Sequence, residues 1–164
     1  SYKDISLLKQ CEAAVDRFYN SGKFLLTLDL VLKSGGLDPF RLFCRLGGLM
    51  AGEPGGLSLE RLAELAYAFL AALPGVDKGT LRDAMALDFL LSESGGRLPG
   101  CLMVADPRLK QALAALRPKY PPGTKLNAVI TYAGGEILHW ADYTRRDPVT
   151  GRYSGGATPL SGLL

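Results

Sequence analysis

A cluster of helix-breaking residues at positions 118–123 constrains the fold of this chain more than any other feature. It holds three prolines and a glycine, and proline lacks the amide proton that a helix needs. Upstream of the cluster, apolar residues recur at the three- and four-residue spacing of packed helices. Downstream, two segments rich in β-branched and aromatic residues flank a glycine pair, which is typical of a β-hairpin. The sequence therefore predicts a mainly α chain of the α+β class, with a small C-terminal antiparallel β-hairpin.

About six helices are predicted upstream of the cluster. The first covers about residues 4–19, and the second covers about residues 23–33. The second is apolar nearly all round, which favours a central buried helix. Asp38 is the predicted N-cap of the third helix, and Gly47 is expected to weaken its end. One apolar face is predicted for the first helix, made of Leu7, Leu8, Cys11, Val15 and Phe18.

Polar caps also predict where the remaining helices begin. Ser58 is the predicted N-cap of the fourth helix. Thr80 and Asp83 form a capping-box-like start for the fifth helix, and the Ser-Gly-Gly sequence at 94–96 is its predicted stop. Asp106 precedes a proline and is expected to open the sixth helix.

The predicted hairpin joins strands at residues 126–132 and 137–143 through Gly134 and Gly135. The last ten residues are rich in glycine and serine, which is typical of a frayed terminus. The predicted organisation is a helical domain (1–118), a β-hairpin extension packed on it (119–154) and a flexible tail (155–164).

The composition is that of an ordinary globular protein. The 164 residues are 48% hydrophobic and 21% charged, so a core without disulfides is feasible. A net charge of +3 does not by itself indicate a nucleic-acid or membrane partner. An odd cysteine count and the absence of a signal peptide favour a reducing, cytoplasmic compartment. Because the chain begins at Ser1 without an initiator methionine, we expect it to be part of a longer protein.

No catalytic constellation can be assembled from this sequence. Cys11, Cys44 and Cys101 are 33 and 57 residues apart, which fits no four-cysteine zinc pattern. His139 is the only histidine, so a multi-histidine metal site is excluded. The glycine pairs match no phosphate-binding loop. We therefore predict no catalytic residue, no metal site and no cofactor in this chain, and we expect that it is not a complete enzyme.

Asp88 is the most unusual single residue, because it falls inside the apolar arc of the fifth helix. A carboxylate in that position must find partners. One interpretation is a ligand-binding or proton-transfer group at the centre of a small-molecule pocket. The other is a buried structural carboxylate that accepts bonds from a helix N-terminus, a tyrosine or an arginine, and we favour it.

The predicted hairpin also carries candidate binding residues. His139 and Trp140 alternate along one strand and should point to opposite faces. Together with Arg145, Arg146 and Arg152, they are candidates for contact with RNA, a nucleotide or an acidic partner. The favoured alternative is a solvated hairpin edge, which its charges protect against pairing with other strands.

The segment from Phe18 to Phe24 is a polar break between two apolar helical patterns. Tyr19 and Asn20 are candidates for a recognition loop. The alternative is a tight turn in which their side chains satisfy helix-end groups. Gly22 suits the left-handed position that follows a helix.

Four segments resemble the uncharacterised C-terminal helical domain of cobalamin-binding radical SAM proteins. They are residues 18–24 (FYNSGKF), 38–40 (DPF), 87–90 (LDFL) and 142–151 (DYTRRDPVTG). The resemblance implies that a cobalamin-binding domain and a radical SAM barrel lie upstream in the same protein and would be its partners. It also implies an iron–sulfur cluster, S-adenosylmethionine and cobalamin as cofactors of that parent enzyme, with methyltransferase activity among the options. The cluster's cysteine triplet and the cobalamin motif are missing here, so no catalytic residue is transferred.

Three functions remain open on these grounds. The first is an accessory domain of such an enzyme, which packs on its barrel or presents substrate. The second is an RNA- or anion-binding module that uses Lys125 and the hairpin arginines. The third is a small-ligand pocket around Asp88.

Overall fold

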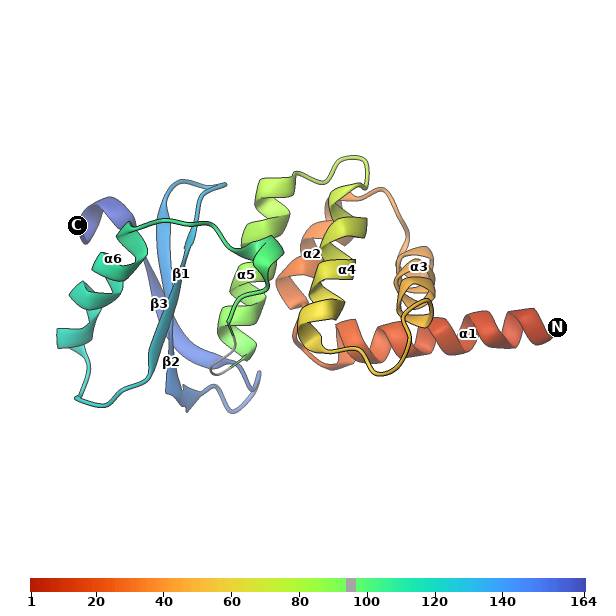
Figure 1. Ribbon diagram of the computed structural model, residues 1–164, viewed down its shortest axis with the longest axis horizontal. Helices are drawn as coiled ribbons and strands as arrows, with labels where there is room; N and C mark the ends of the chain where they lie inside the picture. Colours follow the sequence, from red (N-terminus) through yellow and green to blue (C-terminus); the bar gives the residue numbers. More distant parts are fainter. Residues whose placement is uncertain (94–96) are drawn as a thin grey trace. The chain divides into compact units, whose positions relative to one another are not determined.

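The structure is a computed structural model in which residues 1–93 and 97–164 are described (Figure 1). The described residues form α-helices followed by a three-stranded antiparallel sheet, which confirms the mainly α, α+β class. The α-helices are α1 (Tyr2–Ala14), α2 (Leu25–Ser34), α3 (Pro39–Ala51), α4 (Leu59–Ala71), α5 (Lys78–Ser92) and α6 (Arg108–Leu116), and the strands are β1 (Leu126–Thr131), β2 (Ile137–Arg146) and β3 (Tyr153–Pro159). The predicted stop of α5 at 94–96 lies outside the described residues.

The chain divides into two compact units, Ser1–Met85 and Ala86–Leu164. The division falls inside α5, whereas the sequence suggested a boundary near residue 118. The physical reason is that α6 and the end of α5 pack against the sheet. Helix-forming sequence therefore contributes to both units.

In the first unit, α1 and α3 pack at very short range. A methyl group added to Gly47 would lie 2.5 Å from the backbone carbonyl carbon of Gln10, so only glycine permits this approach. We expected Gly47 to weaken the end of its helix, but α3 continues to Ala51. The predicted apolar face of α1 is only partly buried, since Leu7 is 43% and Leu8 58% exposed.

The prediction that the second helix is buried all round is wrong. In α2 the buried residues are Thr27, Leu28 and Val31, which lie on one face. Leu25, Leu26 and Leu32 lie at the surface and are 39–40% exposed. Apolar side chains cover a large share of any protein surface, so a leucine-rich helix need not be central.

The helix starts are mostly those predicted. Asp38 and Ser58 each accept a backbone N–H bond from three residues on, at 3.0 and 3.1 Å, which confirms both N-caps. The fifth helix differs, because Asp77 is the capping residue and accepts bonds from the backbone and hydroxyl of Thr80. These bonds hold the pKa of the Asp77 carboxyl below its usual range. Asp83 instead forms a buried ion pair with a neighbouring arginine.

In the second unit, the sheet has the order β1-β2-β3. One face packs on α6, through Ala128, Ile130 and Leu138. The other face packs on the end of α5, where Leu90 contacts Val129, and Figure 1 shows a helix on each side of the strands. Both faces of the sheet are therefore covered.

The third strand occupies much of the segment expected to be a flexible tail. Gly155 and Gly156 pair with Ala141 and Trp140 of β2. A methyl group on Gly156 would lie 2.5 Å from the Trp140 ring, so Gly156 allows close packing on the indole. Leu160, just beyond β3, is 2% exposed and belongs to the core.

Candidate functional site

Asp88 forms a buried ion pair with Arg152, 64 residues further along the chain. Its side chain is fully buried, and that of Arg152 is 14% exposed. The Arg152 Nη2 group donates to Asp88 Oδ1 at 2.5 Å. Asp88 is therefore held by an arginine, one of the partners named in the structural interpretation, while ligand binding or proton transfer by Asp88 stays a prediction.

The loop between β2 and β3 positions Arg152 for this pair. Asp147 Oδ1 accepts backbone bonds from Val149 and Thr150, each at 2.8 Å, and these bonds lower the pKa of the Asp147 carboxyl. Gly151 has φ +69°, and the backbone of Asp147 then donates to the Arg152 carbonyl at 2.7 Å. The Asp-Pro-Val-Thr-Gly sequence is therefore a turn that returns the chain to the sheet.

Arg146 joins an aromatic cluster on β2 and β3. Its guanidinium lies 4.4 Å from the centroid of the Tyr153 ring and donates to the Tyr153 hydroxyl at 2.6 Å. The Tyr143 ring packs edge-on against Tyr153 at 4.8 Å. Burial raises the pKa of Tyr143, and a hydrogen bond from Asn127 opposes that rise.

His139 and Trp140 face opposite sides of the sheet, as predicted. The Trp140 indole packs in the α6 cluster and donates to the Tyr120 hydroxyl at 2.6 Å. His139 Nε2 lies 3.0 Å from the Thr131 hydroxyl. Both side chains are only partly exposed, so both are built into the fold.

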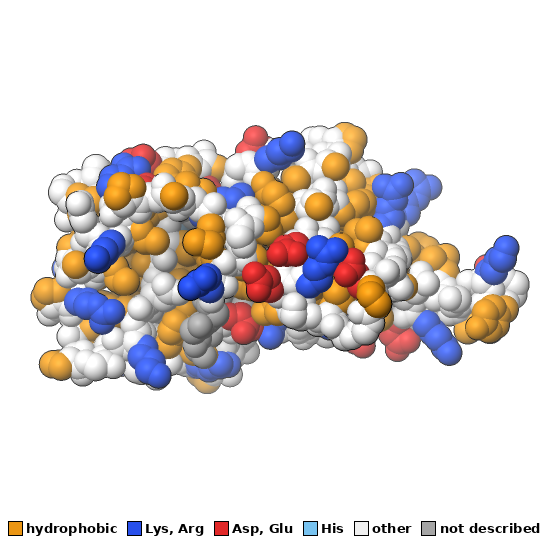
Figure 2. Space-filling view, viewed as in Figure 1, with side chains coloured by type: hydrophobic (Ala, Val, Ile, Leu, Met, Phe, Trp, Pro, Cys, Tyr) orange, Lys and Arg blue, Asp and Glu red, His pale blue; other side chains and the backbone are white. Residues whose placement is uncertain are grey.

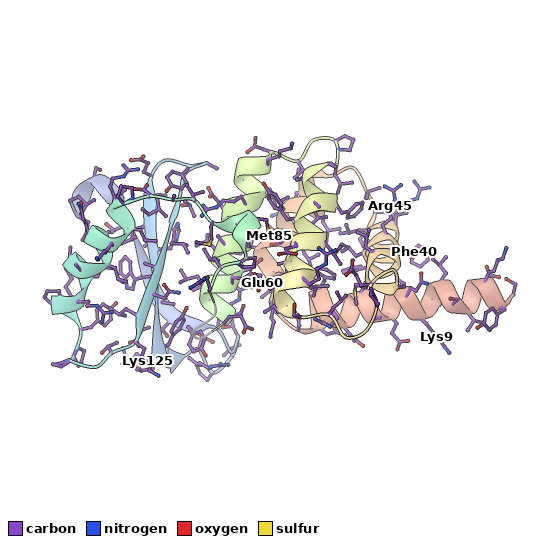
Figure 3. All side chains as sticks on the ribbon, in the orientation of Figure 1. Lys9, Phe40, Arg45, Glu60, Met85 and Lys125 are labelled. Atoms are coloured by element: carbon purple, nitrogen blue, oxygen red, sulfur yellow. The ribbon has the colours of Figure 1, made fainter. Side chains whose placement is uncertain are left out.

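The predicted basic patch is therefore only partly free for other molecules. Arg145 and Lys125 are exposed, and Figure 3 labels Lys125 beside the strands. Arg146 and Arg152 are already engaged within the unit. RNA or anion binding by this surface stays a prediction.

The segment from Phe18 to Phe24 begins in a π-helix, Val15–Asn20, which continues directly from α1, and only its second half is a turn. The two phenylalanine rings lie 4.8 Å apart and are buried. Asn20 donates to the Asp16 carboxylate at 2.7 Å, and Gly22 has the expected positive φ of +69°. Tyr19 is 60% exposed and stays a candidate for contact with a partner.

A second ion cluster, which sequence reasoning missed, ties α6 to the β1–β2 turn. Arg108 donates to both Asp106 and Glu136, and the Tyr132 hydroxyl donates to Asp106 at 2.8 Å. Hydrogen bonds from Arg108 and then Tyr132 hold the pKa of Asp106 far below its usual range. The arginine lowers the pKa of Glu136 for the same reason. These contacts stabilise the start of α6.

Sequence reasoning also missed an apolar groove between α1 and α3, called here the α1–α3 groove. Its volume is about 380 Å³, and its lining residues are Leu7, Leu37, Phe40, Arg41, Cys44 and Arg45. Phe40 is 54% exposed, and it comes from α3 together with Arg45 (Figure 3). Figure 2 shows hydrophobic side chains next to basic ones in this part of the first unit. The sequence signal for the groove is a repeated pair on α3, Phe40-Arg41 and Cys44-Arg45, in which an apolar residue precedes an arginine at a four-residue spacing.

Cys44 of α3 lines the α1–α3 groove, and Cys11 of α1 is buried. Burial, and next the Cys11 thiol, raise the pKa of Cys44. All three cysteines are free thiols.

Within the described part of the chain, no three histidine, cysteine, aspartate or glutamate side chains are grouped as metal ligands would be. No described helix is both long and apolar enough to cross a bilayer.

The described residues thus form an α+β domain. Asp88, Arg146 and Arg152 make contacts within the fold, and the first unit exposes an apolar groove. The profile of a family described as a protein of unknown function (DUF4080) matches residues 1–130. The chain therefore belongs to the DUF4080 family. Neither the curated proteins nor the solved structures contain a significant match to it.

Proposed function

We propose that this chain is a non-catalytic accessory domain of a cobalamin-dependent radical SAM enzyme, where it packs on the catalytic barrel or presents substrate. The observation that carries the proposal is the exposed apolar surface of the first unit. Leu7 and Phe40, which line the α1–α3 groove, are 43% and 54% exposed. Ile5 and Leu8 of α1, outside the groove lining, are 55% and 58% exposed. Exposed apolar patches that adjoin polar residues commonly mark interaction sites.

The four segments that carry the family resemblance support this proposal through their roles in the fold. Gly22 allows the turn after α1, and Asp38 caps α3. Asp88 pairs with Arg152, and Asp147 organises the loop that delivers Arg152. These motifs therefore specify the fold of the domain, and their order along the chain, which resembles that of the proposed family, supports the proposal.

The described residues do not fit a cluster-binding role. Among the described residues, no three histidine, cysteine, aspartate or glutamate side chains are grouped so that they could hold a metal ion. In the proposed parent enzyme, radical chemistry with S-adenosylmethionine, an iron–sulfur cluster and cobalamin would reside in the upstream domains. Methyl transfer is among the reactions that such a parent supports. The free thiols favour a reducing compartment, and we place the enzyme in the cytoplasm.

The open reading frame that encodes this chain tests the proposal. We expect an upstream region with a closely spaced cysteine triplet and a histidine-containing cobalamin motif. The encoded protein, purified and reconstituted without oxygen, should bind iron and cobalamin in amounts that the 164-residue chain does not. A start codon immediately before Tyr2 would overturn the proposal.

A further inference from the structure

We infer that the α1–α3 groove binds an acidic amphipathic helix, whose apolar side chains enter the groove while its carboxylates pair with Arg41 and Arg45. This inference rests on the proposed docking function. It adds the chemistry of the docking partner, a protein segment in which negative charge accompanies apolar anchors.

The groove offers the apolar part of such a site. Leu7 of α1 and Phe40 of α3 line it and are 43% and 54% exposed. A volume of about 380 Å³ lies at the low end of the roughly 300–1,000 Å³ of pockets for small molecules. It is therefore suited to a few side chains. Grooves between two helices commonly accept one face of a third helix.

The rim of the groove is basic. Arg41 and Arg45 are four residues apart on α3, so they lie on the same side of the helix. No acidic residue is among the described residues that line the groove. The side chain of Arg41 is 76% exposed even though it pairs with Asp38 at 3.5 Å. The guanidinium of Arg45 lies 5.8 Å from the Phe69 ring centroid.

Carboxylates are the natural partners for this rim. Charge-assisted hydrogen bonds to arginine are roughly twice as strong as neutral ones. They also specify a partner more than they add affinity, because a basic segment would be repelled. An acidic side chain one turn away from an apolar anchor would satisfy both parts of the groove at once.

A membrane surface is a less suitable occupant. Helices that lie in the membrane interface carry an apolar face opposite a basic one. In α1 the charges have both signs, as Lys3, Asp4, Lys9 and Glu12 show. The apolar groove residues also line a concavity between two helices, where a flat lipid surface makes poor contact.

Fluorescence anisotropy with two labelled helical peptides tests the inference on the 164-residue chain. Both peptides are about 20 residues long, enough for stable helix, with the same leucine pattern. One carries glutamate and the other lysine at the polar positions. The test variant is Arg41→Glu/Arg45→Glu, and the matched control is Lys110→Glu/Arg117→Glu in the second unit. Sedimentation with neutral and anionic phospholipid vesicles tests the membrane alternative.

We expect the acidic peptide to bind the wild-type chain roughly tenfold more tightly than the basic one, a difference of about 1.4 kcal/mol. The Arg41→Glu/Arg45→Glu variant should reverse that preference, and the control should keep it. Circular dichroism checks that the variants fold; if the test variant does not, the wild-type preference decides. Equal binding of the two peptides, no peptide binding, an unchanged preference in a folded variant, or binding to vesicles alone would overturn the inference. A reading frame without a catalytic region would overturn the proposed function but leave the peptide result standing.

Discussion

Replacing Gly47 by alanine should destabilise the first unit, even though alanine favours helices. The added methyl group would lie 2.5 Å from the Gln10 carbonyl carbon and 3.2 Å from the Cys11 amide nitrogen. Both are backbone atoms of α1, so α1 and α3 must move apart. Alanine gains about 0.5–1 kcal/mol over glycine in a helix, whereas overpacking costs roughly 1–3 kcal/mol. We expect a net loss of about 1 kcal/mol in the free energy of unfolding.

Gly48 supplies the matched control, because it is the next residue of the same helix and a methyl group there meets nothing within 4 Å. Gly48→Ala should therefore be stabilising by about 0.5–1 kcal/mol. The two variants should differ by roughly 1–3 kcal/mol, which urea unfolding followed by circular dichroism can measure. If Gly47→Ala proved as stable as Gly48→Ala, the close packing of α1 on α3 would be refuted. The α1–α3 groove, which residues of both helices line, would then be refuted as well.

Three further predictions concern the ionisable groups. Asp88→Asn should lower the free energy of unfolding by roughly 3 kcal/mol, because it leaves the mostly buried guanidinium of Arg152 without its carboxylate. The double variant Asp88→Leu/Arg152→Met should recover most of this loss. If urea unfolding showed no effect of Asp88→Asn, the ion pair would be contradicted. Because hydrogen bonds from an arginine and a tyrosine lower the folded-state pKa of Asp106, its stabilising effect is present above the unfolded pKa of about 4 and is lost as the pH falls through the folded value. The difference in the free energy of unfolding between wild type and Asp106→Asn should therefore become smaller below about pH 4. A difference that does not depend on pH would count against the ion cluster of Asp106 and Arg108. Because α3 packs at short range on α1 beside Cys11, mild oxidation should cross-link Cys11 to Cys44. Peptide mass mapping detects the cross-link, and failure to form it would argue against this packing.

Much of the fold could be predicted because its signals are local. An aspartate before a proline and a serine before an apolar run act through the nearest backbone amides, so Asp38 and Ser58 were found as caps. A positive φ strongly favours glycine, so the role of Gly22 was also readable. The first two strands followed from their composition, and Asp88 stood out because its helical face is otherwise apolar.

The remaining features depend on residues that meet only after folding. Gly155 and Gly156 look like flexible-tail residues, yet they lie in β3. A side chain at Gly155 would meet the Trp140 backbone, and one at Gly156 would meet the Trp140 ring. Arg152 could not be assigned to Asp88, because nothing local links residues 64 positions apart. The groove was missed for a similar reason: periodicity identifies an apolar helix face but does not show whether that face is covered, as at Leu7.

Hydrogen exchange of α1 and α3 tests the central claim, that the α1–α3 groove is a docking surface, most directly. Exchange would be compared between the 164-residue chain and the protein expressed from the complete reading frame, with α6 as an internal reference. The account predicts slower amide exchange around Leu7 and Phe40 in the complete protein, and loss of that protection when Phe40 is replaced by serine. Equal exchange in the two proteins would show that nothing docks in the groove and would contradict the account.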